Sequence, residues 1–179
     1  MKNDVAKILF TREEIAEKVK SLANQLKGAY EGKNPLILCI LKGSLIFTAD
    51  LVRELDFPCQ IDFMQVSSYG SGAETTGKLK IKKDMDTDIS GRDVIIVEDI
   101  LDTGVTLSNL IQELQRRGAS SVAVCVLLNK PARRISEVKA DYIGYDIENE
   151  FVIGYGLDYD EKYRNLPYIG VLKREIYEK

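Results

Sequence analysis

A strand that turns directly into a helix is the feature that most restricts how this chain folds. Residues 94–97 form an apolar run typical of a buried strand, and residues 98–106 lead from it into a segment with helical periodicity. Apolar side chains then recur at positions i, i+3, i+4 and i+7, with polar residues on the other face. These apolar residues are Leu107, Leu110, Ile111 and Leu114. Gly118 stands where a helix C-cap is expected, so the stretch predicts a strand, a turn and an amphipathic helix.

The turn itself has the features of an anion site. The first N–H groups of a helix lack partners inside the helix, and the helix dipole is positive at that end. Thr103 and Thr106 add hydroxyl donors, and Gly104 lets the backbone approach a ligand without a Cβ in the way. Three or four charge-assisted hydrogen bonds of about 1.5–3 kcal/mol each hold a phosphate monoester without a lysine. The alternative is that Asp102 or Thr103 only caps the helix, since both residue types are common caps.

An acidic pair, Glu98 and Asp99, precedes this turn. Consecutive side chains at a strand end point to opposite sides, so we expect the two carboxyl groups to be poorly placed to share one proton. They are suited instead to accept hydrogen bonds from two neighbouring hydroxyl groups, or to bind a metal indirectly. A phosphate site beside groups that accept from a vicinal diol suggests a ribose 5-phosphate as the ligand.

The composition excludes several classes of protein and of site. The 179 residues fit one domain, 1–179, and the net charge of −3 gives no electrostatic reason to expect a nucleic-acid partner. No apolar run reaches the length of a signal peptide or a membrane span, and Cys39, Cys59 and Cys125 lie in apolar runs that suggest reduced, buried thiols. We therefore expect a cytoplasmic protein. Because the chain has no histidine, Ser-His-Asp or Cys-His catalysis and His-ligated zinc are impossible.

A second strand and helix start is predicted near the N-terminus. Residues 35–41 form a continuous apolar run of the kind that a buried parallel strand shows, and a helix is expected to extend from there to about Leu55. Between the two lie Lys42, Gly43 and Ser44, which make a second candidate anion site. The alternative is an ordinary helix start with Ser44 as its cap.

A glycine- and hydroxyl-rich stretch at residues 68–78 contains a near match to the P-loop pattern. Gly72, Gly77 and Lys78 have the required spacing, but Leu79 stands where a P-loop has Ser or Thr. Lysines alternate with apolar residues over 78–82, which is strand periodicity where a P-loop needs a helix. We therefore reject an ATPase site and interpret the stretch as a mobile lid, with an inert hairpin tip as the alternative.

Residues 94–106, VIIVEDILDTGVT, resemble the phosphoribosyl diphosphate motif of type I phosphoribosyltransferases. The order of Glu98 and Asp99, and the aspartate at 102, resemble the hypoxanthine-guanine members of that family. Separated motifs continue the resemblance along the chain, at Leu41-Lys42-Gly43, Ser68-Tyr69, Lys130-Pro131, Phe151-Val152, Gly156-Leu157-Asp158 and Arg164. The resemblance implies an α/β fold whose mostly parallel central sheet is flanked by helices. It also implies a flexible lid at about 68–83, a small purine-binding hood at about 141–179, and a cis peptide bond between Leu41 and Lys42.

The resemblance further implies transfer of a 5-phosphoribosyl group from phosphoribosyl diphosphate to N9 of hypoxanthine or guanine, giving IMP or GMP and pyrophosphate. Asp102 takes the role of the base that removes the proton from purine N7. Phosphoribosyl diphosphate is assigned to Lys42, Gly43, Ser68, Tyr69, Glu98, Asp99, Asp102, Thr103, Gly104, Val105, Thr106 and Arg164. The purine is assigned to Lys130, Phe151, Val152 and Asp158, and Mg²⁺ to Glu98, Asp99 and Asp158. Relatives form dimers and tetramers, so the resemblance also implies a homodimer or a homotetramer.

Two alternatives stay open at this point. An adenine-preferring transferase is disfavoured by Lys130, which only donates hydrogen bonds and so suits a 6-oxo group, but xanthine remains a possible substrate. A regulator of this fold that binds RNA is the alternative from another class, and the acidic net charge argues against it. Val105 departs from some relatives, which place lysine there, and the backbone amides of the turn are expected to bind phosphate without it.

Overall fold

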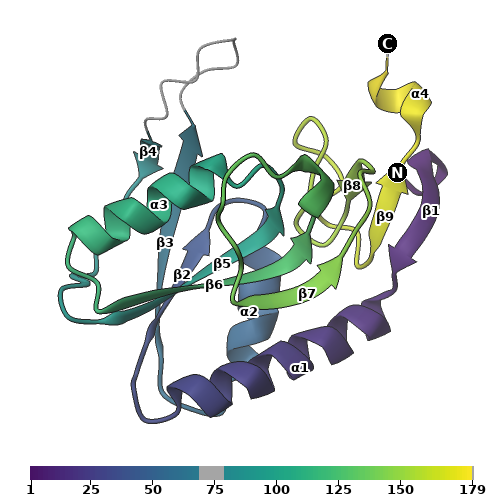
Figure 1. Cartoon of the computed structure of the whole chain (residues 1–179). Coiled ribbons are helices and arrows are strands. Elements are labelled where there is room, and N and C mark those ends of the chain that lie inside the picture. Colours follow the sequence, from purple (N-terminus) through teal and green to yellow (C-terminus); the bar gives the residue numbers. More distant parts are fainter. Residues whose placement is uncertain (69–78, 179) are drawn as a thin grey trace.

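A six-stranded sheet forms the centre of the computed structural model, which describes residues 1–68 and 79–178 (Figure 1). The strand order is β4-β3-β2-β5-β6-β7, and neighbouring strands from β3 to β7 are parallel, whereas β4 is antiparallel to β3. The strands are β2 (Leu36–Ile40), β3 (Gln60–Ser68), β4 (Leu79–Lys83), β5 (Asp93–Leu101), β6 (Ser121–Asn129) and β7 (Tyr142–Asp146). The mostly parallel sheet predicted from the sequence is thereby confirmed.

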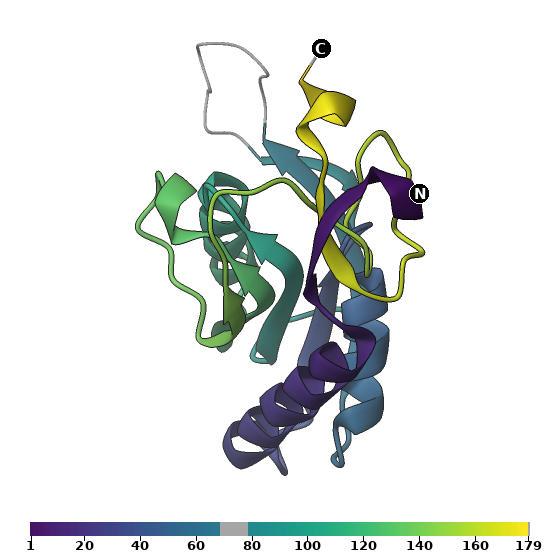
Figure 2. The ribbon, with the colours of Figure 1, turned by 90° about the vertical axis from the view of Figure 1, so that its right-hand side faces the viewer.

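Helices cover both faces of this sheet. The helices α1 (Arg12–Tyr30) and α2 (Leu45–Glu54) lie together on one face, and α3 (Val105–Arg116) lies on the other (Figures 1 and 2). Alternate strand residues supply the two cores, so Ile37 packs with α1 and α2, whereas Leu36 and Leu38 pack with α3. All five residues of β2 are buried, as expected of a parallel strand with helices on both sides.

The helix ends show defined capping arrangements. Thr11 and Glu14 form a reciprocal capping box at the start of α1, with N···O distances of 2.8 and 3.2 Å. Gly118, with φ +90°, follows the last residues of α3. Ser44 is the N-cap residue of α2, but its hydroxyl donates to the carbonyl of Ile40 at 2.7 Å and does not cap the helix. The interpretation of Ser44 as a side-chain cap is therefore wrong.

A second, smaller sheet joins the two ends of the chain. Its order is β1-β9-β8, all antiparallel, with β1 (Val5–Phe10), β8 (Val152–Ile153) and β9 (Ile169–Leu172). Short helical turns complete the fold, namely η1 (Lys2–Asp4), η2 (Pro131–Arg133) and α4 (Arg174–Tyr177). The small sheet differs from the expected hood of about 141–179 in two respects: it includes the N-terminal β1, and β7 belongs to the central sheet. The sequence analysis missed β1 because its partner strand is more than 150 residues away.

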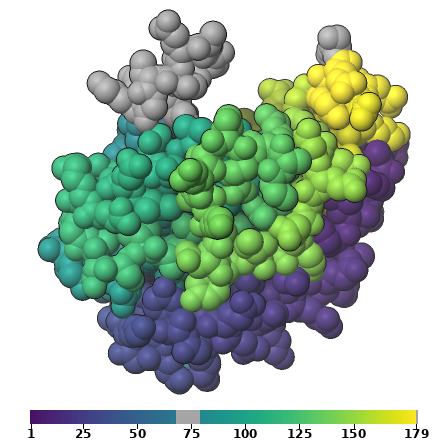
Figure 3. Space-filling view, in the orientation of Figure 1, coloured from purple at the N-terminus to yellow at the C-terminus, as the bar shows by residue number. Residues whose placement is uncertain are grey.

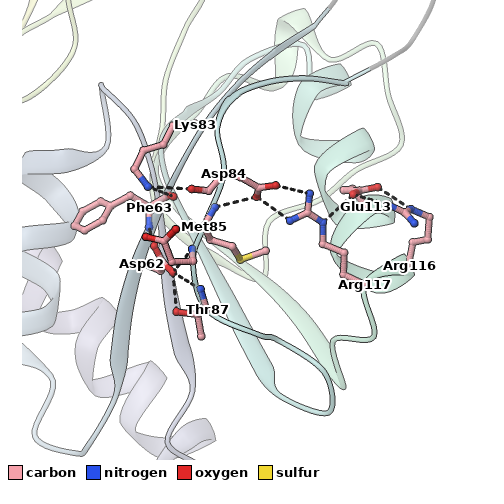
Figure 4. A network of polar contacts seen from close by, with 10 residues as sticks. Asp62, Phe63, Lys83, Asp84, Met85, Thr87, Glu113, Arg116 and Arg117 are labelled. Atoms are coloured by element: carbon pink, nitrogen blue, oxygen red, sulfur yellow. Dashed lines mark hydrogen bonds and ion pairs between the residues drawn. The ribbon is translucent and has the colours of Figure 1, made fainter.

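A network of polar contacts ties the segment after β4 to β3 and α3 (Figure 4). The buried carboxylate of Asp62 accepts hydrogen bonds from the backbone of Phe63, from the backbone of Asp86, and from both the backbone and the hydroxyl of Thr87. Further along, Arg117 makes a bidentate pair with Asp84 at 2.7 and 2.9 Å, and its Nε donates to Glu113 at 2.8 Å. Every carboxylate in this network has a partner, so the network braces the scaffold.

The strand β4 also settles one motif. It occupies residues that would begin a helix after a P-loop, so the rejection of an ATPase site is confirmed. The predicted lid residues 69–78, including Tyr69, lie outside the described part of the chain. None of the helices in the described residues is long and apolar enough to cross a membrane. The three cysteines are free thiols; Cys39 and Cys125 are buried, and Cys59 is half-buried.

Candidate active site

The turn between β5 and α3, residues 101–106, is the centre of the candidate site. Gly104 is the N-cap of α3 and adopts φ +79°, a left-handed conformation that favours glycine. Gly104, not Asp102 or Thr103, holds the N-cap position, while the Thr103 hydroxyl accepts a long hydrogen bond from the Val105 N–H at 3.5 Å. A hollow of about 230 Å³ opens at this turn and is lined in part by Glu98, Asp102, Thr103, Gly104 and Thr106. The structure thus gathers the predicted anion-binding residues around one cavity.

Glu98 and Asp99 differ from the expectation drawn from strand alternation. Burial and the negative charge of Asp99 raise the pKa of Glu98 well above its usual range, and the two carboxyl groups interact directly. Burial also raises the pKa of Asp99, while the Ile100 N–H at 2.8 Å and the charge of Arg164 oppose that rise. The two carboxyl groups therefore interact more closely than strand alternation predicts, while their sharing of a proton stays untested. Alternation fixes only the direction of Cβ, and the side chains are long enough to bring the two carboxyl groups together.

The loop after β2 packs closely against this acidic pair. A Cβ built on Gly43 would lie 1.7 Å from Asp99 Oδ2, so a side chain at position 43 requires the Asp99 carboxyl group to move. Gly156, at φ +102°, approaches from the other side, and its Cβ would lie 2.0 Å from the Gly43 carbonyl oxygen. The peptide bond between Leu41 and Lys42 is cis, as the resemblance implied. The backbone of residues 41–43 is therefore held between Asp99 and the segment around Gly156.

Arg164 connects several of the predicted residues. It donates from Nη1 to the Gly156 carbonyl at 2.7 Å and pairs through Nη2 with Asp158 at 2.8 Å. Its buried Nε has no hydrogen-bond partner among the described residues. Lys42 pairs with Glu161 at 3.0 Å, and Glu161 lies 3.5 Å from Arg164. Asp158 and Arg164 thus form an ion pair, and this pair lies next to the Gly43 loop.

Lys130 is buried, with only 5% of its surface exposed, and is not the solvated charge common at a strand end. Its Nζ donates to the Glu150 carbonyl at 2.8 Å, and its backbone N–H donates to the Leu101 carbonyl at 2.9 Å. Burial lowers the pKa of Lys130, and the charge of Asp102 opposes this. Asp102 lies 3.4 Å from Arg133 Nε, while the same buried Oδ1 accepts no hydrogen bond within the described residues. Asp102 and Lys130 are thus neighbours.

Phe151 and Val152 lie where the small sheet meets this edge of the central sheet. Val152 is buried in β8, and Phe151 is 37% exposed. The Phe151 ring stacks on Tyr177 with centroids 4.9 Å apart and meets the edge of Tyr159 at 5.5 Å. One aromatic side chain thus remains partly open beside the residue that Lys130 contacts. The sequence analysis missed Tyr177, because no local pattern links a C-terminal tyrosine to residue 151.

Some predicted residues fall outside this description. Ser68 ends β3, but its side chain is not described, and Tyr69 lies outside the described residues. Glu161, Asn129 and Arg134 contact the site and were missed. For Arg134 the only signal was two adjacent arginines shortly after Lys130. A larger hollow of about 520 Å³ between α1, α2 and residues 155–167 contains none of the predicted site residues.

The carboxylates present fit a divalent cation only in part. Within residues 1–68 and 79–178, no three acidic or cysteine side chains gather to hold a metal ion by themselves. Mg²⁺ commonly keeps several waters and binds through one or two carboxylates together with substrate phosphates. Glu98, Asp99 and Asp158 are therefore suited to support a cation that a phosphorylated substrate brings, and are not suited to enclose one alone.

Comparison with known proteins places these features in a family. The family model for the phosphoribosyl transferase domain matches residues 6–160. The chain is 54% identical over 179 residues to the hypoxanthine-guanine phosphoribosyltransferase of Streptococcus thermophilus, covering 100% of this chain and 99% of that protein. It is 49% identical to the enzyme of the same name from Bacillus subtilis, covering 99% of each. The crystal structure of a hypoxanthine phosphoribosyltransferase from Staphylococcus aureus matches with a TM-score of 0.97 and 48% identity, covering 100% of this chain and 97% of that one.

Proposed function

The chain belongs to the phosphoribosyltransferase family, and we propose that it transfers a 5-phosphoribosyl group from phosphoribosyl diphosphate to N9 of hypoxanthine or guanine. The products are IMP or GMP and pyrophosphate, which makes the protein a purine salvage enzyme. This function rests on the family, on the named relatives of similar length, and on the arrangement of groups at the 101–106 loop.

The observation that carries the choice of base is the position of Lys130 beside Asp102. A 6-oxopurine presents its O6 and N7 atoms next to each other on one edge. A buried ammonium donates to O6, and a neighbouring carboxylate accepts a proton from N7. The Lys130 backbone is bonded to Leu101, directly before Asp102, so the two side chains are held in fixed relation. Adenine has a 6-amino group that also donates, so it does not match the Lys130 donor.

The phosphoribosyl group is assigned to the 101–106 loop and the acidic pair before it. The 5-phosphate lies against the N-terminus of α3, where Thr103, Gly104, Val105 and Thr106 supply amide and hydroxyl donors. Glu98 and Asp99 accept hydrogen bonds from the ribose hydroxyl groups. Burial raises the pKa of both carboxyl groups, and hydroxyl donors on the sugar are partners that offset the cost of keeping them charged.

The pyrophosphate is assigned to the opposite side of the ribose. Lys42 and Gly43 offer backbone groups there, and Arg164 offers a planar fork whose Nε has no partner in the described residues. Ser68 and Tyr69 of the predicted lid belong to the same subsite by resemblance. The purine stacks on the exposed part of Phe151, and the backbone of Val152 contacts its 2-position edge, with Asp158 nearby.

Proton and charge movements then follow from these positions. The bond between C1 of the ribose and pyrophosphate breaks, the bond to purine N9 forms, and Asp102 takes the proton from N7. A divalent cation, which we propose is Mg²⁺, neutralises charge on the pyrophosphate when it is bound. Glu98, Asp99 and Asp158 are proposed to support it directly or through water. Assembly as a homodimer or homotetramer is also proposed, and the mass of the protein in solution measures it.

The direct test is nucleotide formation by the purified protein with phosphoribosyl diphosphate and Mg²⁺. Hypoxanthine, guanine, xanthine, adenine and uracil are offered separately. We expect conversion of hypoxanthine and guanine that stops when a chelator is added. Conversion of adenine but not of the 6-oxopurines contradicts the role of Lys130, and conversion of no base contradicts the proposed function.

A further inference from the structure

One short segment of the chain, residues 129–138, holds three successive carbonyl groups of the 101–106 loop. The Leu101 carbonyl accepts from the Lys130 N–H at 2.9 Å and from Arg134 at 3.2 Å. The Asp102 carbonyl accepts from Arg134 Nε at 3.0 Å. The Thr103 carbonyl accepts from the backbone N–H groups of residues 135 and 136 at 3.0 and 3.2 Å, and from the Ser136 hydroxyl at 3.3 Å.

Arg134 is the centre of this arrangement. Besides the two loop carbonyls, it donates to the Val138 carbonyl at 2.8 Å and to Asn129 Oδ1 at 2.6 Å. The Asn129 amide is itself oriented by its Nδ2, which donates to Asp146 at 2.6 Å. All four acceptors of Arg134 are neutral, and no carboxylate pairs with it within the described residues. The guanidinium is therefore held next to the 101–106 loop by neutral acceptors.

The geometry of the peptide bond gives these contacts a consequence for anion binding. In a planar trans peptide the C=O of one residue and the N–H of the next point in opposite directions. When the carbonyls of Leu101, Asp102 and Thr103 are held toward the 129–138 segment, the N–H groups of Asp102, Thr103 and Gly104 point the other way. By holding the carbonyl groups on its own side, the guanidinium leaves the backbone N–H groups on the opposite face of the loop.

The close approach of the two segments fixes this arrangement. A Cβ built on Gly104 would lie 2.4 Å from Ser136 Oγ and 2.6 Å from Val138 Cγ1. The green surface formed by the residues after β6 lies directly against the teal surface of α3 in the space-filling view (Figure 3). The 101–106 loop is therefore backed by packed chain, and it has little room to turn its peptide groups over.

We propose that Arg134 is a positioning residue for substrate binding, which holds the 101–106 loop so that its backbone donors face the 5-phosphate of phosphoribosyl diphosphate. This inference rests on the proposed function for the identity of the anion. Arg134 does not touch the substrate in this account; it acts through the Leu101 and Asp102 carbonyls and through its charge. Lysine at this position keeps the charge but has no planar fork to reach four acceptors.

The test compares the variants Arg134→Lys and Arg134→Gln with the wild type. Steady-state rates are measured against phosphoribosyl diphosphate and against hypoxanthine, and equilibrium binding of ribose 5-phosphate is measured without a purine. We expect the KM for phosphoribosyl diphosphate and the Kd for ribose 5-phosphate to rise about 10- to 100-fold, the effect of losing one or two well-aligned donors. The KM for hypoxanthine and kcat are expected to change by less than about fivefold.

Arg92→Lys is the matched control. Arg92 also links segments that are distant in sequence, because it donates to Gln60 and to the Asn34 carbonyl, but it lies just before β5, at the other end of that strand from the 101–106 loop. It is expected to leave the KM for phosphoribosyl diphosphate unchanged. If both Arg134 variants fail to fold, Ser136→Ala removes a single donor to Thr103 and is expected to raise the same Kd about threefold. Unchanged ribose 5-phosphate binding in a folded Arg134 variant overturns the inference. Wild-type protein that binds ribose 5-phosphate but forms no nucleotide contradicts the proposed function alone.

Discussion

The carboxylates of the network in Figure 4 and those of the candidate active site have opposite surroundings. In the network, the Arg116 and Arg117 side chains lower the pKa of Glu113 to about 2, and Arg117 lowers that of Asp84. In the site, burial and a neighbouring negative charge raise the pKa of Glu98 well above its usual range. Network carboxylates are paired with cations or N–H groups, whereas Glu98 has another carboxyl group beside it.

This difference separates scaffold from site by a physical criterion. A paired carboxylate contributes to folding, because its partner compensates for lost hydration. Two like charges buried together cost stability, and such an arrangement commonly marks a functional site. Asp102 stands between the two groups: its Oδ1 lies 3.4 Å from Arg133 Nε but accepts no hydrogen bond among the described residues. The carboxylates of the site lack such a full set of partners. A ligand hydroxyl group, a proton or a cation can supply the missing partner.

The largest expected effect comes from removing one charge at the site. Asp102→Asn keeps the shape of the side chain but cannot accept the N7 proton, so kcat is expected to fall about 10²- to 10⁴-fold, the usual range for a general base. Binding of phosphoribosyl diphosphate is expected to weaken far less, because the backbone amides of the loop remain. Steady-state kinetics and equilibrium binding measure the two effects, and equal losses in both contradict the assignment of the base.

Asp84→Asn is the matched variant in the network. It makes the same chemical change but removes half of the bidentate pair with Arg117. We expect its kcat to match the wild type and its melting temperature to fall, the reverse of Asp102→Asn. If the two variants change kcat and melting temperature in the same way, the distinction between network carboxylates and site carboxylates fails.

The fold was largely predictable because its signals are local. The apolar run at 35–41 and the strand, turn and helix at 94–117 each contain their own periodicity, and both were found, although β5 continues through the acidic pair to Leu101 and so passes the predicted strand end at residue 97. The small sheet was only partly predictable, since β1 pairs with β9 across almost the whole chain. Pairing between distant strands leaves no periodic trace in either segment.

In the candidate site, too, the features with local sequence signals were predicted and those that depend on distant contacts were not. Its loop at 101–106 was located from Thr103, Gly104 and the helix that follows, which are adjacent in sequence. The contact between Glu98 and Asp99 was misjudged, because strand alternation describes Cβ directions and not where flexible carboxyl groups meet. Arg134 was missed because its role depends on carbonyl groups about thirty residues earlier, and backbone acceptors carry no sequence signal.

Asp62 is the most heavily bonded carboxylate of the network. Asp62→Ala leaves the donors of Phe63, Asp86 and Thr87 without their acceptor in a buried place. We expect the free energy of unfolding to fall by about 2–4 kcal/mol, with unchanged KM values. Urea unfolding at neutral pH measures this loss. Asp62→Asn keeps one oxygen as an acceptor and should lose less; a loss as large as that of alanine contradicts the hydrogen-bond explanation.

The smallest expected effect is a change in how stability depends on pH. The pKa of Glu98 in the folded state is raised. Its contribution to the free energy of unfolding is therefore fully present below its unfolded-state pKa of 4.5 and is lost as pH rises through its folded-state pKa. Glu113 behaves in the opposite way, because its folded-state pKa is lowered to about 2. Its contribution to the free energy of unfolding is present above pH 4.5 and is lost as pH falls toward about 2. Stability is therefore expected to rise slightly as pH drops from neutral toward 5, and to fall steeply below about 4.5. Glu98→Gln should remove the first change and keep the second, and it should raise the melting temperature at pH 7. Melting curves across this pH range measure both changes in stability. A Glu98→Gln protein that is less stable than the wild type at pH 7 would show that the acidic pair stabilises the fold.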